Sequence, residues 1–374
     1  MDSAASESTR LRVRDLSPMI LAAGRAMRLR PLTQRRAKAV VPFLNRPLLD
    51  YTLDWLRRHG FAEVTINLHH AGASIVSRYR QRAFQMQVRY SREPVLLGTA
   101  GGPRAALGSL GSHVLLLNGD VVTTLTLGGL VAHHGASEAL ATLALTRGPA
   151  GSGYPQCLAA ADGRLLAFPG DDPPEPAPVS GAFTGVHIVE RAVLENVPER
   201  AVCGIVDPVY RELLAAGLPV HAVGLPGTWY EMGDPGRYID HQLASLLRGD
   251  LPLALVGSRR FVASGYLGTH THLENVRLVA PFLLGSGVRV KHGSYLEGVV
   301  AGVRTRFESG SRLQQVVTWE GACIGPGCDL RRVIVMDHVR VPARTQAEGV
   351  VFTPGGPIRF EIGESAGSEA AQAG

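Results

Sequence analysis

Residues 18–56 read PMILAAGRAMRLRPLTQRRAKAVVPFLNRPLLDYTLDWL, and this stretch decides how the first part of the chain folds. Its opening MILAAG (19–24) is an apolar run that ends in small residues, which predicts a buried strand followed by a turn. An amphipathic helical pattern begins near the end of this stretch, just after Pro47, and Gly60 beyond the stretch is expected to end the helix. The stretch therefore predicts a strand, an arginine-rich loop and a helix, in that order.

The same alternation continues along the chain. EVTINL (63–68) and HVLLLNGD (113–120) predict strands, and SIVSRYRQR (74–82) predicts a helix. Such alternation is typical of a Rossmann-like α/β fold, a mixed and mostly parallel sheet with helices on both faces. Ligands of these sheets bind at the carboxyl ends of the strands. We therefore expect a site at Ala23–Gly24 and Asn118–Asp120.

The character of the sequence changes after Asp250, where helical patterns give way to valine, glycine and turn residues. HGSYLEGVV, SGSRLQQVV and PGCDLRRVI align with a constant interval. The aligned positions, each 17 residues apart, are Gly293, Gly310 and Gly327; Leu296, Leu313 and Leu330; Val299, Val316 and Val333; and Val290, Phe307, Ile324 and Val341. Apolar residues also recur six apart, as in a hexapeptide repeat. This predicts a triangular parallel β-helix of about four coils, with an antiparallel β-sandwich as the alternative.

These patterns divide the chain into four expected parts. A flexible tail over 1–17 precedes an α/β domain over 18–249. A β-helix over 250–360 then precedes a second flexible tail over 361–374. The exposed coils of the β-helix suit contacts between chains, so we expect a homo-oligomer.

Composition indicates a globular protein and disfavours several classes of function. The 374 residues are 45% hydrophobic, yet no apolar run reaches the roughly 18–20 residues of a membrane span, and no secretory signal is expected at the start. The net charge of +6 comes from scattered arginines without a base-stacking motif, so no nucleic-acid partner is expected. The four cysteines form no CxxC pair, which is typical of a reduced cytoplasm; they are Cys157, Cys203, Cys323 and Cys328.

Lysine is rare in this chain. Lys38 and Lys291 are the only lysines among 38 basic residues, so a lysine in the first loop suggests a role that arginine does not fill. That loop follows a strand and can direct N–H groups at a phosphate, with Arg28 and Arg30 adding charged hydrogen bonds. It is neither a Walker A loop nor a GxGxxG loop, and on these residues alone an ordinary surface loop is equally favoured.

The opening stretch resembles the signature of the sugar-phosphate nucleotidyltransferase family, AAGxGTRLxPLT followed by PK and a second proline before a helix. The positions kept in register are Ala22, Ala23, Gly24, Arg28, Leu29, Pro31, Leu32, Thr33, Lys38, Pro42 and Pro47. Further segments resemble later family motifs in the same order: LLGTAGG (96–102), LNGD (117–120), GAFTGVHIV (181–189) and WYEMGDPGRY (229–238). The version of the second motif is similar to mannose-1-phosphate guanylyltransferases and some uridylyltransferases, and a C-terminal left-handed β-helix is common in the family.

The resemblance implies transfer of a nucleotidyl group from a nucleoside triphosphate, with GTP or UTP favoured, to a sugar 1-phosphate. It implies that Arg28 holds the leaving pyrophosphate and that Lys38 contacts the α-phosphate and the incoming sugar phosphate. It also implies nucleotide-binding residues Leu21, Ala22, Ala23, Gly24, Gly98, Thr99 and Ala100; sugar-binding residues Asn118, Gly119, Thr184 and Gly185; and Mg²⁺ ligands Asp120 and Glu231. His69 and His70 are expected to be polar surface, because no further ligand lies at metal-binding spacing.

Several positions depart from the family pattern. Ala26 replaces a glycine, Met27 a threonine or serine, Ala37 a proline, and Glu231 an aspartate. FPGDDPPEP (168–176) stands where the family has Glu-Lys-Pro, which removes one cation from the sugar-phosphate site. These changes favour a second hypothesis, a catalytically weakened regulatory subunit that binds nucleotide or sugar beside an active paralogue. An acyltransferase built on the β-helix is disfavoured, because no acyl-site histidine can be identified.

Overall fold

The computed structural model describes residues 11–147, 153–173, 175–250, 259–262 and 264–361. The chain divides into two compact units, each described by itself. The α/β unit comprises residues 1–25, 36–40 and 49–230, and the β-helix unit comprises 26–35, 41–48 and 231–374. Most of both expected tails, and residues 251–258 beside the expected boundary at 249, lie outside the described residues.

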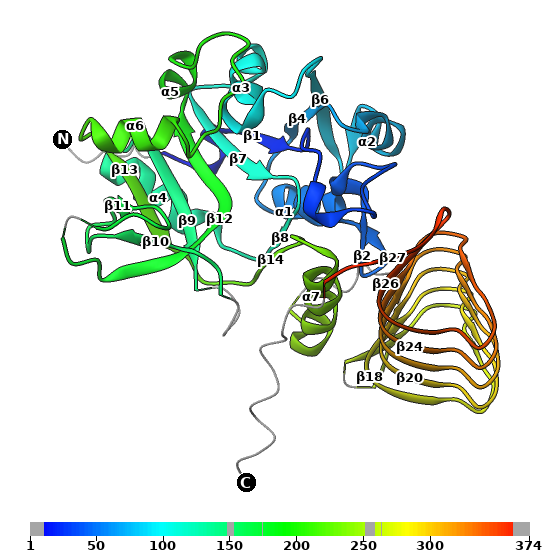
Figure 1. Ribbon diagram of the computed structural model, residues 1–374. Coiled ribbons are helices and arrows are strands. Elements are labelled where there is room, and N and C mark those ends of the chain that lie inside the picture. The colour runs from blue at the N-terminus through cyan, green and yellow to red at the C-terminus, as the bar shows by residue number, and fades with distance from the viewer. Residues whose placement is uncertain (1–10, 148–152, 174, 251–258, 263, 362–374) are drawn as a thin grey trace, which may run out of the picture. The chain divides into compact units, whose positions relative to one another are not determined.

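The α/β unit is built on a ten-stranded mixed sheet in the order β11-β10-β12-β7-β1-β4-β6-β5, with β9 paired to β12 and β13 (Figure 1). Its strands are β1 (Leu16–Leu21), β4 (Glu63–Leu68), β5 (Arg82–Ala83), β6 (Met86–Arg92), β7 (His113–Asn118), β9 (Ala141–Thr146), β10 (Gln156–Ala159), β11 (Leu165–Ala167), β12 (Val179–Glu190) and β13 (Val220–Gly224). Strands β7, β1, β4 and β6 run parallel to one another, and β12 is antiparallel to β7. The predicted α/β sheet is therefore confirmed.

Helices cover this sheet: α1 (Leu48–Arg58), α2 (Gly72–Tyr79), α3 (Gly98–Ala105), α4 (Leu127–Ser137), α5 (Arg191–Glu195) and α6 (Val209–Ala215). Short 3₁₀ turns are η2 (Val13–Asp15), η4 (Lys38–Val40) and η5 (Leu107–Ser109), and strands β8 (Val121–Thr123) and β14 (Trp229–Glu231) form a separate ribbon. Among the described residues, no helix combines the length and the apolar character that crossing a membrane requires.

Two boundaries of the α/β unit differ from the prediction. The first strand begins at Leu16, inside the expected flexible tail, because Leu16 is buried and pairs with His113 of β7. The helix predicted over 74–82 spans Gly72–Tyr79 instead. It ends there because Arg80 adopts a positive φ of 50°, which a helix cannot continue.

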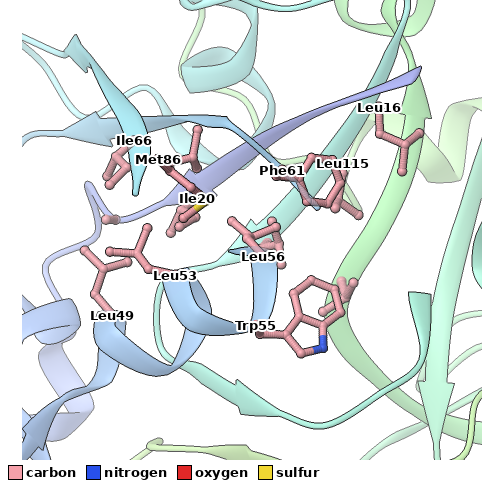
Figure 2. Packing of buried hydrophobic residues seen from close by; sticks show 14 of the residues in the cluster. Leu16, Ile20, Leu49, Leu53, Trp55, Leu56, Phe61, Ile66, Met86 and Leu115 are labelled. Carbon is pink, nitrogen blue, oxygen red and sulfur yellow. The ribbon is translucent and has the colours of Figure 1, made fainter. Parts of the chain in front are cut away.

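The apolar stripe of α1 packs against the sheet, as its sequence predicted. Figure 2 shows Leu49, Leu53 and Leu56 of α1 directed at Ile20 of β1 and Ile66 of β4. All five side chains are fully buried. Burying a leucine or isoleucine side chain contributes about 1.5–3 kcal/mol, so this contact holds α1 firmly on the sheet.

A buried histidine makes the α/β unit sensitive to acid. Burial lowers the pKa of His187 in β12 from 6.5 to about 3. Its Nδ1 lies 2.9 Å from the hydroxyl of Tyr210, whose own pKa is raised well above its usual value by burial, so the phenol donates. The imidazole is therefore neutral in the folded protein.

We expect this histidine to destabilise the protein as the pH falls. The unfolded chain binds the proton below about pH 6.5, whereas the folded chain excludes it until about pH 3. The effect of His187 on the free energy of unfolding is therefore small above pH 6.5 and grows as the pH falls toward 3. Between pH 6.5 and 5 it lowers the free energy of unfolding by about 2 kcal/mol. Urea unfolding of His187→Asn should show a shallower pH dependence, whereas the exposed-site control His292→Asn should match the parent. Equal slopes for both variants would contradict the assignment.

The coils of the β-helix unit form an eight-stranded and a five-stranded sheet, both mainly parallel (Figure 1). Its strands are β15 (Arg259–Val262), β16 (Gly265–Leu267), β17 (His272–Leu273), β18 (Arg277–Leu284), β19 (Arg289–Val290), β20 (Tyr295–Ala301), β21 (Arg306–Phe307), β22 (Arg312–Thr318), β23 (Cys323–Ile324), β24 (Asp329–Val335), β25 (Arg340–Val341), β26 (Gln346–Thr353) and β27 (Gly356–Arg359). Within these two sheets, as far as the structure describes them, only β15 with β16 and β26 with β27 pair antiparallel. The predicted β-helix is confirmed, and the antiparallel sandwich is excluded; its handedness stays a prediction.

Three corners in each coil explain the repeat. Residues with positive φ recur every 17 positions in three series: His270, Gly287, Arg304, Gly321 and His338; Gly293, Gly310, Gly327 and Arg344; and Gly298, Gln315, Arg332 and Gly349. Three turns per coil make a triangular section. The first described coil is one residue longer than the others. Its register shows this, since Arg277 pairs with Tyr295 but, after a shift, Phe282 pairs with Val299. The five-stranded sheet also adds one coil, at β17, before the four aligned units.

Helix α7 (Pro235–Arg248) packs on strands β18, β20, β22 and β24 of the β-helix. Asp234 caps its start by accepting from the Arg237 N–H, and Gly249 with a φ of 63° ends it. The almost fully buried Arg332 donates two hydrogen bonds to Asp240 of α7, at 2.8 and 3.1 Å. This charged pair fixes the helix on the coils.

Candidate active site

The turn that follows β1 is held by a side chain on the next strand. Asn67 of β4 is buried, and its Oδ1 accepts hydrogen bonds from the N–H groups of Ala22 and Ala23 at 2.6 and 3.2 Å. The Leu21 carbonyl accepts from the Gly119 N–H at 2.9 Å. The backbone over Leu21–Gly24 is therefore fixed by β4 and by the end of β7.

A second buried side chain connects this turn with the segment at Gly98. Both oxygens of Glu93 accept hydrogen bonds, Oε1 from Asn67 Nδ2 at 2.7 Å and Oε2 from the Leu97 N–H at 2.9 Å. Glu93 is only 4% exposed. The two segments predicted to read the base thus share one network, Ala22–Asn67–Glu93–Leu97.

Asn67 and Glu93 were not among the predicted site residues. The sequence carries a weak signal for each of them. Asn67 is a polar residue near the end of the apolar run EVTINL, and Glu93 precedes Gly98 by five positions. Neither signal shows that the two side chains meet, because the contact joins residues 26 positions apart.

The start of α3 is covered by a later loop. The Cys203 carbonyl accepts from the Ala100 N–H at 2.9 Å, and the Thr99 hydroxyl accepts from the Ile205 N–H at 2.8 Å. Gly98 has a φ of 82°, and a Cβ there would lie 2.5 Å from the Cys203 oxygen. Part of the hydrogen-bonding capacity assigned to Gly98, Thr99 and Ala100 by resemblance is therefore used inside the protein.

The ends of β1 and β7 meet at an ion pair. Gly119 approaches Leu21 so closely that a Cβ would lie 2.8 Å from the Leu21 carbonyl oxygen. The next residue, Asp120, accepts a hydrogen bond from Nζ of Lys38. Their side chains are only 20% and 13% exposed. The structure thus brings Lys38, Asp120 and the turn after β1 together at the predicted edge of the sheet.

The residues predicted to bind sugar lie beside this pair in the sheet. Gly185 in β12 has a φ of 74°, and a Cβ there would lie 2.3 Å from Nδ2 of Asn118. Thr184 is buried; its hydroxyl donates to the Ala144 carbonyl at 2.8 Å, and its carbonyl accepts from Trp229 Nε1 at 2.9 Å. Thr184 therefore shapes the strand, and its hydroxyl is already engaged within the protein.

The remaining two predicted residues belong to the β-helix unit. Arg28 lies in η3 (Met27–Leu29), and its Nη2 is 3.4 Å from Oε1 of Glu231. The Arg28 side chain is 73% exposed, whereas that of Glu231 is 21% exposed. Ala26 precedes η3 with a φ of 46°, a conformation that glycine adopts at lower cost. Alanine in place of the family's glycine therefore strains the backbone of this loop.

His69 and His70 both contact the backbone of neighbouring segments. Nδ1 of His69 lies 2.9 Å from the Glu93 carbonyl, and the His70 N–H donates to the Ala23 carbonyl at 3.3 Å. Within the described part of the chain, neither belongs to a cluster that could hold an ion. Cys157, Cys203, Cys323 and Cys328 are all free thiols.

Comparison with known proteins gives a consistent result. The family model described as "Nucleotidyl transferase" matches residues 17–245. UTP–glucose-1-phosphate uridylyltransferase of a Synechocystis strain is 26% identical, covering 84% of this chain and 86% of the relative. Mannose-1-phosphate guanylyltransferase of Mycobacterium tuberculosis is also 26% identical, covering 84% and 82%. Mannose-1-phosphate guanylyltransferase 1 of Arabidopsis thaliana is 23% identical over 93% and 98%. The chain therefore belongs to the nucleotidyl transferase family, and its predicted membership of the sugar-phosphate nucleotidyltransferases is confirmed.

Proposed function

We propose that this protein joins a nucleoside triphosphate to a sugar 1-phosphate and releases pyrophosphate. The observation that carries the proposal is the ion pair of Lys38 and Asp120 at the carboxyl ends of β1 and β7. The reaction gathers several phosphate charges at one point, so it needs a fixed cation beside a ligand-binding edge. Lys38 meets that need with a nearly buried ammonium group.

The chemistry is an in-line displacement at the α-phosphorus. An oxygen of the sugar phosphate forms a bond to that phosphorus while the bond to pyrophosphate breaks. Lys38 holds the α-phosphate and the incoming phosphate, where a compact charge fits better than a planar guanidinium. Arg28 holds the leaving pyrophosphate through charged hydrogen bonds. Leu21–Gly24 and Gly98–Ala100 position the base, with GTP or UTP favoured.

Asp120 and Glu231 suit Mg²⁺ as a cofactor. Both present carboxylate oxygens, the donor atoms that this ion prefers, and both side chains are about one-fifth exposed. Each carboxylate bonds to a cationic side chain, Asp120 to Lys38 and Glu231 to Arg28. We propose that Asp120 and Glu231 would hold Mg²⁺, which would neutralise phosphate charge when substrates are bound, and that Lys38 and Arg28 would contact the phosphates. Asn118, Gly119, Thr184 and Gly185 shape the sugar side.

One observation favours the alternative of a regulatory subunit with weakened catalysis. The loop before Arg28 contains Ala26 with a positive φ and the exposed Met27, where the family pattern has glycine and a hydroxyl residue. Both changes reduce how well the loop can hold a pyrophosphate. In either case we propose assembly through the exposed coils of the β-helix and a cytoplasmic location, which the free thiols support.

The deciding experiment measures pyrophosphate release with a panel of nucleoside triphosphates and sugar 1-phosphates in the presence of Mg²⁺. We expect release with at least one pair containing GTP or UTP. Nucleotide binding without release from any pair would support the regulatory alternative instead. Absence of both binding and release would contradict the whole proposal.

A further inference from the structure

A cluster of three ligand-type side chains lies at the far end of β7 from Lys38 and Asp120. His113 is the first residue of β7, and it pairs across the sheet with Glu190, the last residue of β12. His134 approaches from helix α4. Asn118 ends β7 five residues later, so the cluster is roughly 17 Å along the strand from the proposed reaction site. All three residues belong to the α/β unit.

The three side chains converge on one point. Nδ1 of His113 and Nε2 of His134 lie 2.6 and 2.8 Å from the same oxygen, Oε1 of Glu190. The ligand atoms of the three residues all lie within 4.8 Å of one another. Around a tetrahedral zinc ion with bonds of about 2.0–2.1 Å, neighbouring ligand atoms lie roughly 3.3 Å apart. Small side-chain shifts would therefore convert these hydrogen bonds into a coordination shell.

The burial of the cluster also suits an ion. His134 is only 3% exposed, whereas the side chains of His113 and Glu190 are 34% and 24% exposed. His134 is therefore buried, whereas His113 and Glu190 reach the surface, so an ion and a water ligand can enter from the solvent. It joins two strands and a helix, so a bound ion would link three elements of the unit.

A second hydrogen bond holds His134 in place. Its Nδ1 lies 2.8 Å from the hydroxyl of Thr142 in β9, which is fully buried. A hydroxyl group can both donate and accept. It can therefore accept a hydrogen bond from the Nδ1–H group when Nε2 binds an ion, and donate one to Nδ1 when Nε2 carries the proton. Such outer partners orient the histidine ligands of metal sites.

We propose that His113, His134 and Glu190 form a site for Zn²⁺, with a water molecule as the fourth ligand. Two imidazoles and one carboxylate are a ligand set that zinc accepts, whereas Mg²⁺ prefers oxygen ligands alone. The site is separate from the Mg²⁺ ligands proposed for the reaction, Asp120 and Glu231. A second histidine pair, His133 and His221, has ring nitrogens 3.1 Å apart, but within the described part of the chain it is not part of a group of three possible ligands.

The test measures Zn²⁺ binding to the full-length, tag-free protein by titration against a chelating indicator. We expect the parent to bind one ion that His113→Ala and Glu190→Gln do not bind. Thr142→Val keeps the shape of the side chain and removes only the hydroxyl. It should weaken binding of the same ion about 10–100-fold, the usual effect of losing an outer partner.

The matched control is His133→Ala, which removes a histidine of the same helix adjacent to His134 and should leave binding unchanged. Thermal unfolding of each variant without zinc identifies any that fail to fold, and Thr142→Val keeps the test informative if others do. No bound ion in the parent, or equal binding in the parent and in folded His113→Ala, would overturn the proposal. The readout needs no nucleotide, so it is independent of pyrophosphate release.

Discussion

Replacement of Lys38 by alanine is expected to slow pyrophosphate release by about 10²–10³-fold, the usual effect of removing one preorganised charge that stabilises a transition state. The side chain is 13% exposed and bonded to Asp120, so it is held in place before substrates bind. The loss should fall mainly on kcat, because the lysine acts most strongly when charge builds up on the reacting phosphate. Steady-state release assays at saturating substrate would measure it.

Two further variants make this prediction specific. Lys38→Arg keeps the charge but replaces a compact ammonium with a planar fork, so it should recover only part of the rate. The matched control is Lys291→Ala, which removes the only other lysine. Lys291 is half exposed and pairs with Glu308 in the β-helix unit, so its loss should leave the rate unchanged. A near-normal rate for folded Lys38→Ala would refute the role of Lys38.

Most of the fold could be predicted from local pattern. The apolar run at 19–24 predicted the first strand, which spans Leu16–Leu21, and the amphipathic pattern after Pro47 predicted the helix that follows it. The β-helix was visible because each coil repeats the same corners, and a corner with positive φ favours glycine at positions such as Gly293 and Gly310. Coil corners at Arg304 and Arg332 break that rule, so glycine alone marks only part of the repeat.

The candidate site could be predicted where its residues belong to motifs that follow neighbouring strands of the sheet. Asp120 lies just beyond β7, and Lys38 lies in the segment that follows β1, so the two motifs start from the carboxyl ends of neighbouring parallel strands. No comparable sequence rule predicts the hydrogen bond between Asn67 and Glu93. It depends on which atom of one side chain faces which atom of another, and this follows from the packed structure and not from spacing.

Replacement of Glu93 by alanine is expected to lower the free energy of unfolding by about 2–6 kcal/mol, because two buried donors lose their acceptor and each costs about 1–3 kcal/mol. Those donors are Asn67 Nδ2 and the Leu97 N–H. Without Glu93, the amide group of Asn67 is no longer held in one orientation, so its Oδ1 should accept less well from the N–H groups of Ala22 and Ala23. The turn after β1 should loosen, and KM for the nucleotide should rise more than kcat falls.

Glu93→Gln separates hydrogen bonding from shape. Glutamine has nearly the same size, but one of its two terminal atoms is a donor and must face Asn67 Nδ2 or the Leu97 N–H. It should therefore cost about 1–3 kcal/mol, for one unmatched buried donor. The control Glu63→Gln changes an exposed carboxylate that pairs with Arg89, and should cost less than about 1 kcal/mol. If Glu93→Gln unfolds in urea like Glu63→Gln and keeps its KM, then the buried network does not position the nucleotide-binding turn.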